Sequence, residues 1–217
     1  MGKIEDAVKL LKEGKMLVIY DGDEREGEAD LVFHAGFASP EMIERLRKDA
    51  GGLICVALAK EHADAIGLPF YTEYLSKAGG TLEKLECKKT AYGDAPSFSI
   101  AVNNKKVYTG ITDDDRALTI SEIAKLVESE NPKQRFIDDF YSPGHVFLLI
   151  GRGIENRKGH TELTLELAKK AGLTGVMVLC EMLGKGKALP KKDAQKYAEE
   201  NGFVFIKGVD IYEAGNR

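Results

Sequence analysis

The sequence predicts a single α/β-type domain in which helices pack against a mixed β-sheet. Three observations support this prediction: helical and strand-like segments alternate along the chain, no internal repeat occurs, and no low-complexity linker divides it. The chain has 217 residues, 43% hydrophobic and 30% charged, which is enough to bury a sizeable core. We therefore expect one domain over residues 1–217.

Apolar spacing and turn residues place the individual elements. Apolar side chains between Ile4 and Leu11 repeat at helical spacing, and Ser39 with Pro40 forms a typical helix start. Residues 68–94 lack a clear period, which predicts a long ordered loop. Helices are expected at 4–13, 40–50, 120–128, 161–171 and 194–200, and strands at 16–20, 53–58, 97–102, 145–150, 176–179 and 204–206.

Charge and cysteine content limit the class of protein. The net charge of −4 does not favour a nucleic-acid partner, and no apolar stretch has the length of a signal peptide or a membrane span. Three cysteines without CxxC spacing fit reduced thiols in a cytoplasmic protein. Cys55 and Cys180 lie in apolar runs and are expected in the core, whereas Cys87 lies in a polar stretch and is the candidate reactive thiol.

A dense acidic segment surrounds Arg25 and lies between two apolar runs. In an extended chain alternate acidic residues would share one face, and in a helix Glu26 and Asp30 would still share one. Anchored like charges repel each other unless cations or protons offset them, and oxygen ligands suit Mg²⁺ or Mn²⁺. A solvated acidic turn is the alternative. The six carboxylates are Asp21, Asp23, Glu24, Glu26, Glu28 and Asp30.

A second candidate site is the turn at residues 157–161, which leads directly into a predicted helix. Free backbone N–H groups at a helix start attract anions, and cationic side chains with a hydroxyl beside them suit a phosphate group. An imidazole in the same turn can bind a metal ion or move a proton. A simple capped helix is the alternative. The residues are Arg157, Lys158, Gly159, His160 and Thr161.

Two further side chains are candidates for acid–base chemistry. Glu181 ends a buried strand, where partial desolvation would raise its pKa toward the range of a general acid or base. An exposed strand-end carboxylate is the alternative. His145 lies where a loop enters a strand, and a lone histidine there is more often structural.

Five motifs in this order closely resemble the 3,4-dihydroxy-2-butanone 4-phosphate synthases of riboflavin biosynthesis. The resemblance covers roughly residues 4–212 and includes no appended cyclohydrolase domain. It implies an α+β fold with helices on both faces of a mixed, twisted sheet. The motifs are Asp21–Asp30, Tyr108–Ile111 with Asp115-Arg116, Pro143–Phe147, Gly159–Glu162 and Leu179–Glu181.

The resemblance also implies an activity and roles for the candidate residues. The activity is conversion of D-ribulose 5-phosphate to L-3,4-dihydroxy-2-butanone 4-phosphate and formate. The resemblance implies a cytoplasmic lyase that uses Mg²⁺ or Mn²⁺. It also implies homodimers with active sites near the subunit interface. Glu26 and His160 would be the metal ligands. Glu181 and His145 would act in catalysis, and the acidic segment itself adds Glu28 as a candidate proton shuttle in catalysis. The implied substrate contacts are Arg25, Glu26, Asp30, Arg157, Lys158, Gly159, His160, Thr161 and Glu181.

The residue chemistry agrees with this activity but leaves alternatives open. Enolisation needs a divalent ion, carboxylates that move protons and an anchor for the phosphate group. A metal-dependent phosphosugar isomerase or aldolase would need the same groups but would release no formate. A nucleotide-binding enzyme, such as a threonylcarbamoyl-adenylate synthase, would need a basic groove. In a non-catalytic cation-binding module, replacing Glu26 with Gln would weaken metal binding, but there would be no enzymatic turnover to lose.

Overall fold

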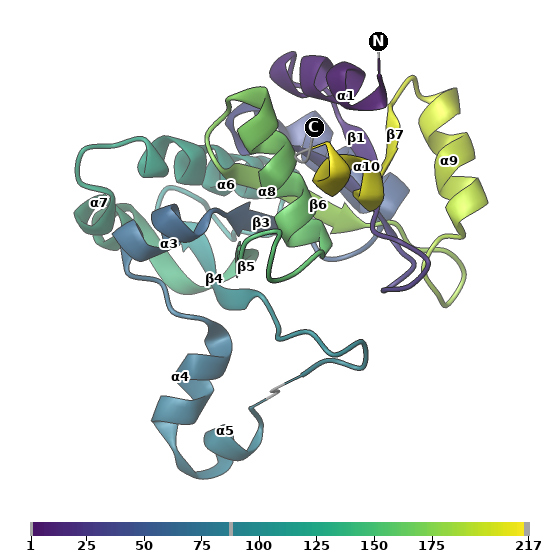
Figure 1. Cartoon of the computed structure of the whole chain (residues 1–217). Coiled ribbons are helices and arrows are strands. Elements are labelled where there is room, and N and C mark those ends of the chain that lie inside the picture. Colours follow the sequence, from purple (N-terminus) through teal and green to yellow (C-terminus); the bar gives the residue numbers. More distant parts are fainter. Residues whose placement is uncertain (1, 87–88, 215–217) are drawn as a thin grey trace.

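Seven strands form one mixed sheet within residues 2–86 and 89–214, which the computed structural model describes (Figure 1). The strand order is β4-β5-β3-β6-β2-β1-β7. β1 pairs with β7 and β3 with β5 in parallel, and the remaining neighbours are antiparallel. The strands are β1 Leu17–Tyr20, β2 Ala29–His34, β3 Cys55–Leu58, β4 Phe98–Asn104, β5 Phe140–Ile150, β6 Val176–Glu181 and β7 Phe205–Lys207.

Helices cover both faces of this sheet, because the side chains of the central strands alternate between two apolar clusters. On β2, Leu31 and Phe33 pack on one face and Val32 on the other. Helices α2, α6 and α9 contribute to the first cluster, and α1, α8 and α10 to the second (Figure 1). The helices on these faces are α1 Lys3–Lys12, α2 Pro40–Arg45, α6 Asp113–Val127, α8 His160–Ala171, α9 Lys191–Glu200 and α10 Gly208–Glu213. The three-layer α+β prediction is confirmed.

Several predicted boundaries match, and their local chemistry explains why. Ser39 accepts a hydrogen bond from the Met42 amide at the start of α2, and Pro40 is the first helical residue. This helix continues as a π-helical turn, Leu46–Ala50, and ends at Gly51, whose φ is +85°. The buried Cys55 and Cys180 are core residues as predicted, whereas Cys87 lies outside the described residues.

The prediction of a loop at 68–94 was wrong. Two short helices, α4 Tyr71–Ala78 and α5 Gly80–Lys84, project away from the sheet as an arm (Figure 1). Neither buries a side chain fully, so the apolar period that reveals a packed helix is weak there. The remaining elements are the 3-10 turn Ala35–Phe37 and helices α3 Lys60–Ile66 and α7 Pro132–Asp139.

Candidate functional site

The acidic segment forms the loop between β1 and β2, and the carboxylate of Asp21 organises it. Asp21 is 7% exposed, and its two oxygens accept hydrogen bonds from the amides of Gly22, Glu26 and Glu28 at 2.8–3.0 Å. The loop is neither a strand nor a helix, so the periodicity argument does not apply to residues 21–28. A carboxylate that accepts several backbone hydrogen bonds holds the loop backbone in one conformation, and this sets the direction of the side chains along the loop.

The acidic loop and the turn at residues 157–161 meet at the first residue of α8. The Nδ1 atom of His160 lies 3.7 Å from Oε2 of Glu26 and 3.6 Å from Oδ1 of Asp30. His160 and Asp30 are buried, at 5% and 1% exposure, and Glu26 is half-buried. The predicted association of the acidic segment with His160, more than a hundred residues downstream, is therefore present.

Strand register brings Glu181 to the same place. Asp30 on β2 pairs directly with Glu181 on β6, and side chains opposite each other in an antiparallel pair lie on the same face. The Leu53 amide donates to Oε2 of Glu181 at 2.8 Å. A Cβ at Gly52 would lie 2.6 Å from the carbonyl oxygen of Glu181, so a side chain there would displace this strand end.

Burial and mutual repulsion change the pKa values of these carboxyls. Burial, with repulsion from Glu181 and Glu26, raises the pKa of Asp30 to about 8. Burial and the charge of Glu26 also raise the pKa of Glu28. Burial alone would raise the pKa of Glu26, but hydrogen bonds from His160 and Tyr92 outweigh burial and lower it to about 2. The cluster thus combines an ionised carboxylate with one that titrates near neutral pH.

The donor set fits a divalent metal ion. One oxygen each from Asp21 and Glu26 and one ring nitrogen of His160 lie within 4.8 Å of one another. Among the described residues, Oδ1 of Asp30 and Nε2 of His160 are buried atoms without a hydrogen-bond partner. The carboxylate oxygens suit Mg²⁺ or Mn²⁺, and His160 would add one imidazole nitrogen. Asp21 was not predicted as a member of this group.

Metal binding is expected to strengthen as the pH rises from about 7 to about 9, because the metal must displace a proton from His160. Burial would lower the pKa of His160, but Asp30 and Glu26 raise it to about 9. The imidazole is therefore mostly protonated at neutral pH, whereas Glu26 is ionised throughout this range. Calorimetric titration with Mg²⁺ in buffers of different ionisation enthalpy would measure the proton release. An affinity independent of pH would contradict this prediction.

Two arginines converge beside the metal-binding group. Nη1 of Arg25 lies 3.0 Å from Asp21 and from Glu26. Arg157 forms a 2.6 Å ion pair with Glu162, whose side chain is fully buried. A Cβ at Gly159 would lie 2.6 Å from Cζ of Arg157 and 2.7 Å from Nη2 of Arg25, so both guanidinium groups pass over this glycine. The start of α8 therefore presents two cations together with its own amides.

Two predicted residues do not join this cluster. Lys158 is exposed, and its ammonium group lies 4.1 Å from the ring centroid of Tyr212. His145 is exposed on β5, which β3 separates from β6, and it contacts Asn103 on β4. Thr161 is buried in the first turn of α8, as expected for a residue of the predicted turn.

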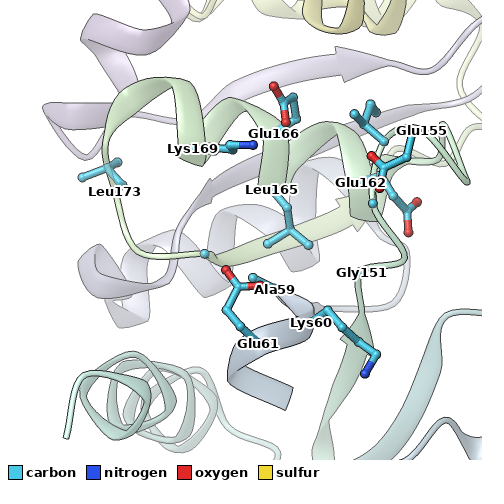
Figure 2. Close-up of a pocket in the computed structure, with 13 residues that line it drawn as sticks. Ala59, Lys60, Glu61, Gly151, Glu155, Glu162, Leu165, Glu166, Lys169 and Leu173 are labelled. Atoms are coloured by element: carbon cyan, nitrogen blue, oxygen red, sulfur yellow. The ribbon is translucent and has the colours of Figure 1, made fainter. Parts of the chain in front are cut away.

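A separate cavity of about 410 Å³ lies beside α8 (Figure 2). Leu165 points from the helix toward Ala59, and Glu166, Lys169 and Lys60 are also among the lining residues. It contains neither the metal-binding group nor the arginines, and Glu162 is its link to the site through the ion pair with Arg157.

Comparison with known proteins identifies the family. The family model described as 3,4-dihydroxy-2-butanone 4-phosphate synthase matches residues 5–214. The chain belongs to this synthase family. The 3,4-dihydroxy-2-butanone 4-phosphate synthase of Methanothermobacter thermautotrophicus is 41% identical over 218 residues, which covers 97% of this chain and 95% of that protein.

Solved structures of the synthase family share the fold. A two-domain 3,4-dihydroxy-2-butanone 4-phosphate synthase from A. baumannii matches with a TM-score of 0.80 and 28% identity, over 97% of this chain and 56% of that one. A 3,4-dihydroxy-2-butanone 4-phosphate synthase in complex with two magnesium ions matches with a TM-score of 0.76 and 26% identity, over 97% of this chain and 95% of that one. No helix in the described part of this family member is long and apolar enough to cross a membrane.

Proposed function

We propose that the chain converts D-ribulose 5-phosphate to L-3,4-dihydroxy-2-butanone 4-phosphate and formate, as a cytoplasmic lyase of riboflavin biosynthesis. The main support is the convergence of Glu26, Asp30 and His160 at the start of α8, in a chain that matches the synthase family over residues 5–214. The proposal treats residues 1–217 as one catalytic domain. A relative in complex with two magnesium ions supports a divalent metal, here Mg²⁺ or Mn²⁺.

Glu26 and His160, with Asp21 beside them, are the proposed metal ligands. When bound, the divalent ion would stabilise the negative charge that develops on the sugar oxygens during enolisation. Arg25 and Arg157 bind the substrate at the start of α8, and Gly159 and Thr161 provide the helix terminus to which the phosphate group binds. This anchoring positions the reacting carbons.

The carboxyls opposite each other on β2 and β6 are proposed to move protons. The reaction removes a proton beside the carbonyl group, forms an enediol, loses water, rearranges the carbon skeleton and releases C4 as formate. Asp30, with a pKa of about 8, can accept and return a proton near neutral pH. Glu181 and a carboxyl of the acidic segment, either Asp30 on β2 or Glu28 in the loop before it, alternate as acid and base.

The first test is the assay of formate from ribulose 5-phosphate. We expect formate in the presence of Mg²⁺ and loss of formate production when EDTA removes the metal. An isomerase or an aldolase acting on the same substrate would give no formate, so this product distinguishes the alternatives. Absence of metal-dependent formate would overturn the proposed function.

The proposal includes a homodimer that buries the exposed loop at residues 108–111, before α6. Tyr108 is 95% exposed and Ile111 52%, although Asp115 holds this loop firmly by accepting three backbone amides. A rigid loop that exposes large apolar side chains favours a partner surface. Tyr108→Glu is expected to reduce the mass measured by light scattering from twice the chain mass to the chain mass. An unchanged mass would contradict this interface.

A further inference from the structure

Asp94, from a turn far from the acidic loop in sequence, lies between the two arginines of the site. Its Oδ2 atom is 2.9 Å from Nη2 and 3.2 Å from Nε of Arg25. The same oxygen lies 3.6 Å from Nε of Arg157. One carboxylate oxygen thus faces both guanidinium groups, which pass over Gly159 at the start of α8.

The arginines do not depend on Asp94 alone for their positions. Arg25 also pairs with Asp21 and Glu26, and Arg157 pairs with the buried Glu162. Removal of the Asp94 charge would therefore leave both guanidinium groups attached to the site. It would also leave Glu26 as the carboxylate that faces both of them, with its Oε1 atom 3.0 Å from Nη1 of Arg25 and 4.0 Å from Nη2 of Arg157. Loss of the Asp94 charge then favours binding of another anion at the same place.

The turn that carries Asp94 is held mainly by polar contacts. The amide and hydroxyl of Thr90 both donate to the carbonyl oxygen of Asp94, and the amide of Gly93 donates to the carbonyl oxygen of Thr90. The hydroxyl of Tyr92 donates a hydrogen bond to Glu26, and its ring centroid lies 4.8 Å from Cζ of Arg25, but the residue is 41% exposed. A segment with little buried apolar surface costs little free energy to displace as a unit.

We propose that Asp94 is an internal counter-ion that occupies the place of the substrate phosphate group between Arg25 and Arg157, and that the phosphate displaces it. A phosphate group carries more negative charge than a carboxylate and has more acceptor oxygens, so it can bind both guanidinium groups at once. The role of Asp94 rests on the proposed function, because it takes the substrate to be a phosphate ester. Part of the phosphate binding energy is then spent on releasing Asp94, which lowers the apparent affinity.

Binding of inorganic phosphate to Asp94→Asn tests this role without turnover. We expect calorimetry at low ionic strength to show binding that is about 3- to 10-fold tighter than in the wild type. Asp94→Glu, which restores the charge, should return the affinity toward the wild-type value. Asp64→Asn on α3 removes an exposed carboxylate paired with Lys60 and should leave phosphate binding unchanged. A variant that merely loosened the fold would bind phosphate more weakly, not more tightly.

A fluorescent reporter tests the displacement itself. The chain contains no tryptophan, so Ala91→Trp places a single indole on the exposed side of the turn. Phosphate should change its emission, and the Asp94→Asn change in the same background should produce much of that shift without phosphate. Unchanged or weaker phosphate binding by Asp94→Asn, or emission that phosphate does not alter, would overturn the role of Asp94. These readouts are independent of formate, so a protein that binds phosphate as expected but releases no formate would contradict only the proposed function.

Discussion

Replacing Glu26 with Gln is expected to abolish metal binding and to reduce formate production by about 10²- to 10³-fold. The Glu26 carboxylate is ionised at neutral pH, with its pKa lowered to about 2, and it lies within the group that includes His160 and Asp21. Gln has nearly the same shape but carries no charge, so it removes the electrostatic attraction for the metal ion without leaving a cavity. Calorimetric titration with Mg²⁺ and a formate assay would measure the two effects.

Glu24→Gln is the matched control for this variant. Glu24 lies in the same loop but is exposed, and it is not one of the metal-binding group. Its replacement should leave metal affinity and formate production close to the wild-type values. If Glu26→Gln retained Mg²⁺ affinity, the metal site would have to be placed elsewhere. Equal losses in both variants would mean that the loop acts through its total charge.

The second large effect is expected for Glu181→Gln, which should lose formate production while it keeps metal binding. Glu181 is not one of the metal-binding group, and its Oε2 accepts the Leu53 amide, a bond that a Gln side chain can also make. The amide cannot take a proton from the substrate, so the enediol should not form. We expect activity to fall by about 10²-fold or more. Exchange of substrate protons with D₂O, followed by NMR, would locate the loss at enolisation.

Glu166→Gln provides the comparison for a carboxyl that lies near the site but outside it. Glu166 lies on α8, pairs with Lys170 and faces the separate cavity of Figure 2. Its variant should exchange protons and release formate at wild-type rates. Proton exchange that persisted in Glu181→Gln would contradict the expected loss at enolisation and would mean that Asp30 or Glu28 removes the first proton.

Much of the site was predictable because its residues have unusual chemistry for their sequence context. Several like charges lie between two core strands, and their repulsion raises the free energy of the folded state unless a ligand offsets it. The Arg-Lys-Gly-His-Thr turn at a helix start likewise concentrates positive charge that an anion would offset. The helices and strands with a packed apolar face were predicted for a related reason: burial imposes a period on the sequence. Glu181 was found by its position at a strand end.

Other parts of the site leave no such pattern. Asp94 lies in a polar turn, and only the folded chain brings it to Arg25, 69 positions away. The role of Asp21 as an acceptor for three loop amides depends on the path of the loop rather than on any period. The arm formed by α4 and α5 buries no side chain fully, so its helices carry little of the apolar signal that prediction requires. The long-range contact of Asp94 and the exposed arm were therefore both missed.

The pairing of Asp30 with Glu181 has a consequence for how this protein can change in length. The two carboxyls meet because β2 and β6 are aligned residue by residue, from Asp30↔Glu181 to His34↔Met177. Deleting one residue within β6 would turn the following side chains to the opposite face and put an apolar neighbour against Asp30. The same slip would move Val178 and Leu179 between the two apolar clusters. Insertions and deletions are thus confined to the ends of these strands. A change in register that disrupts the apolar core would also separate the two carboxyls of the acid–base pair.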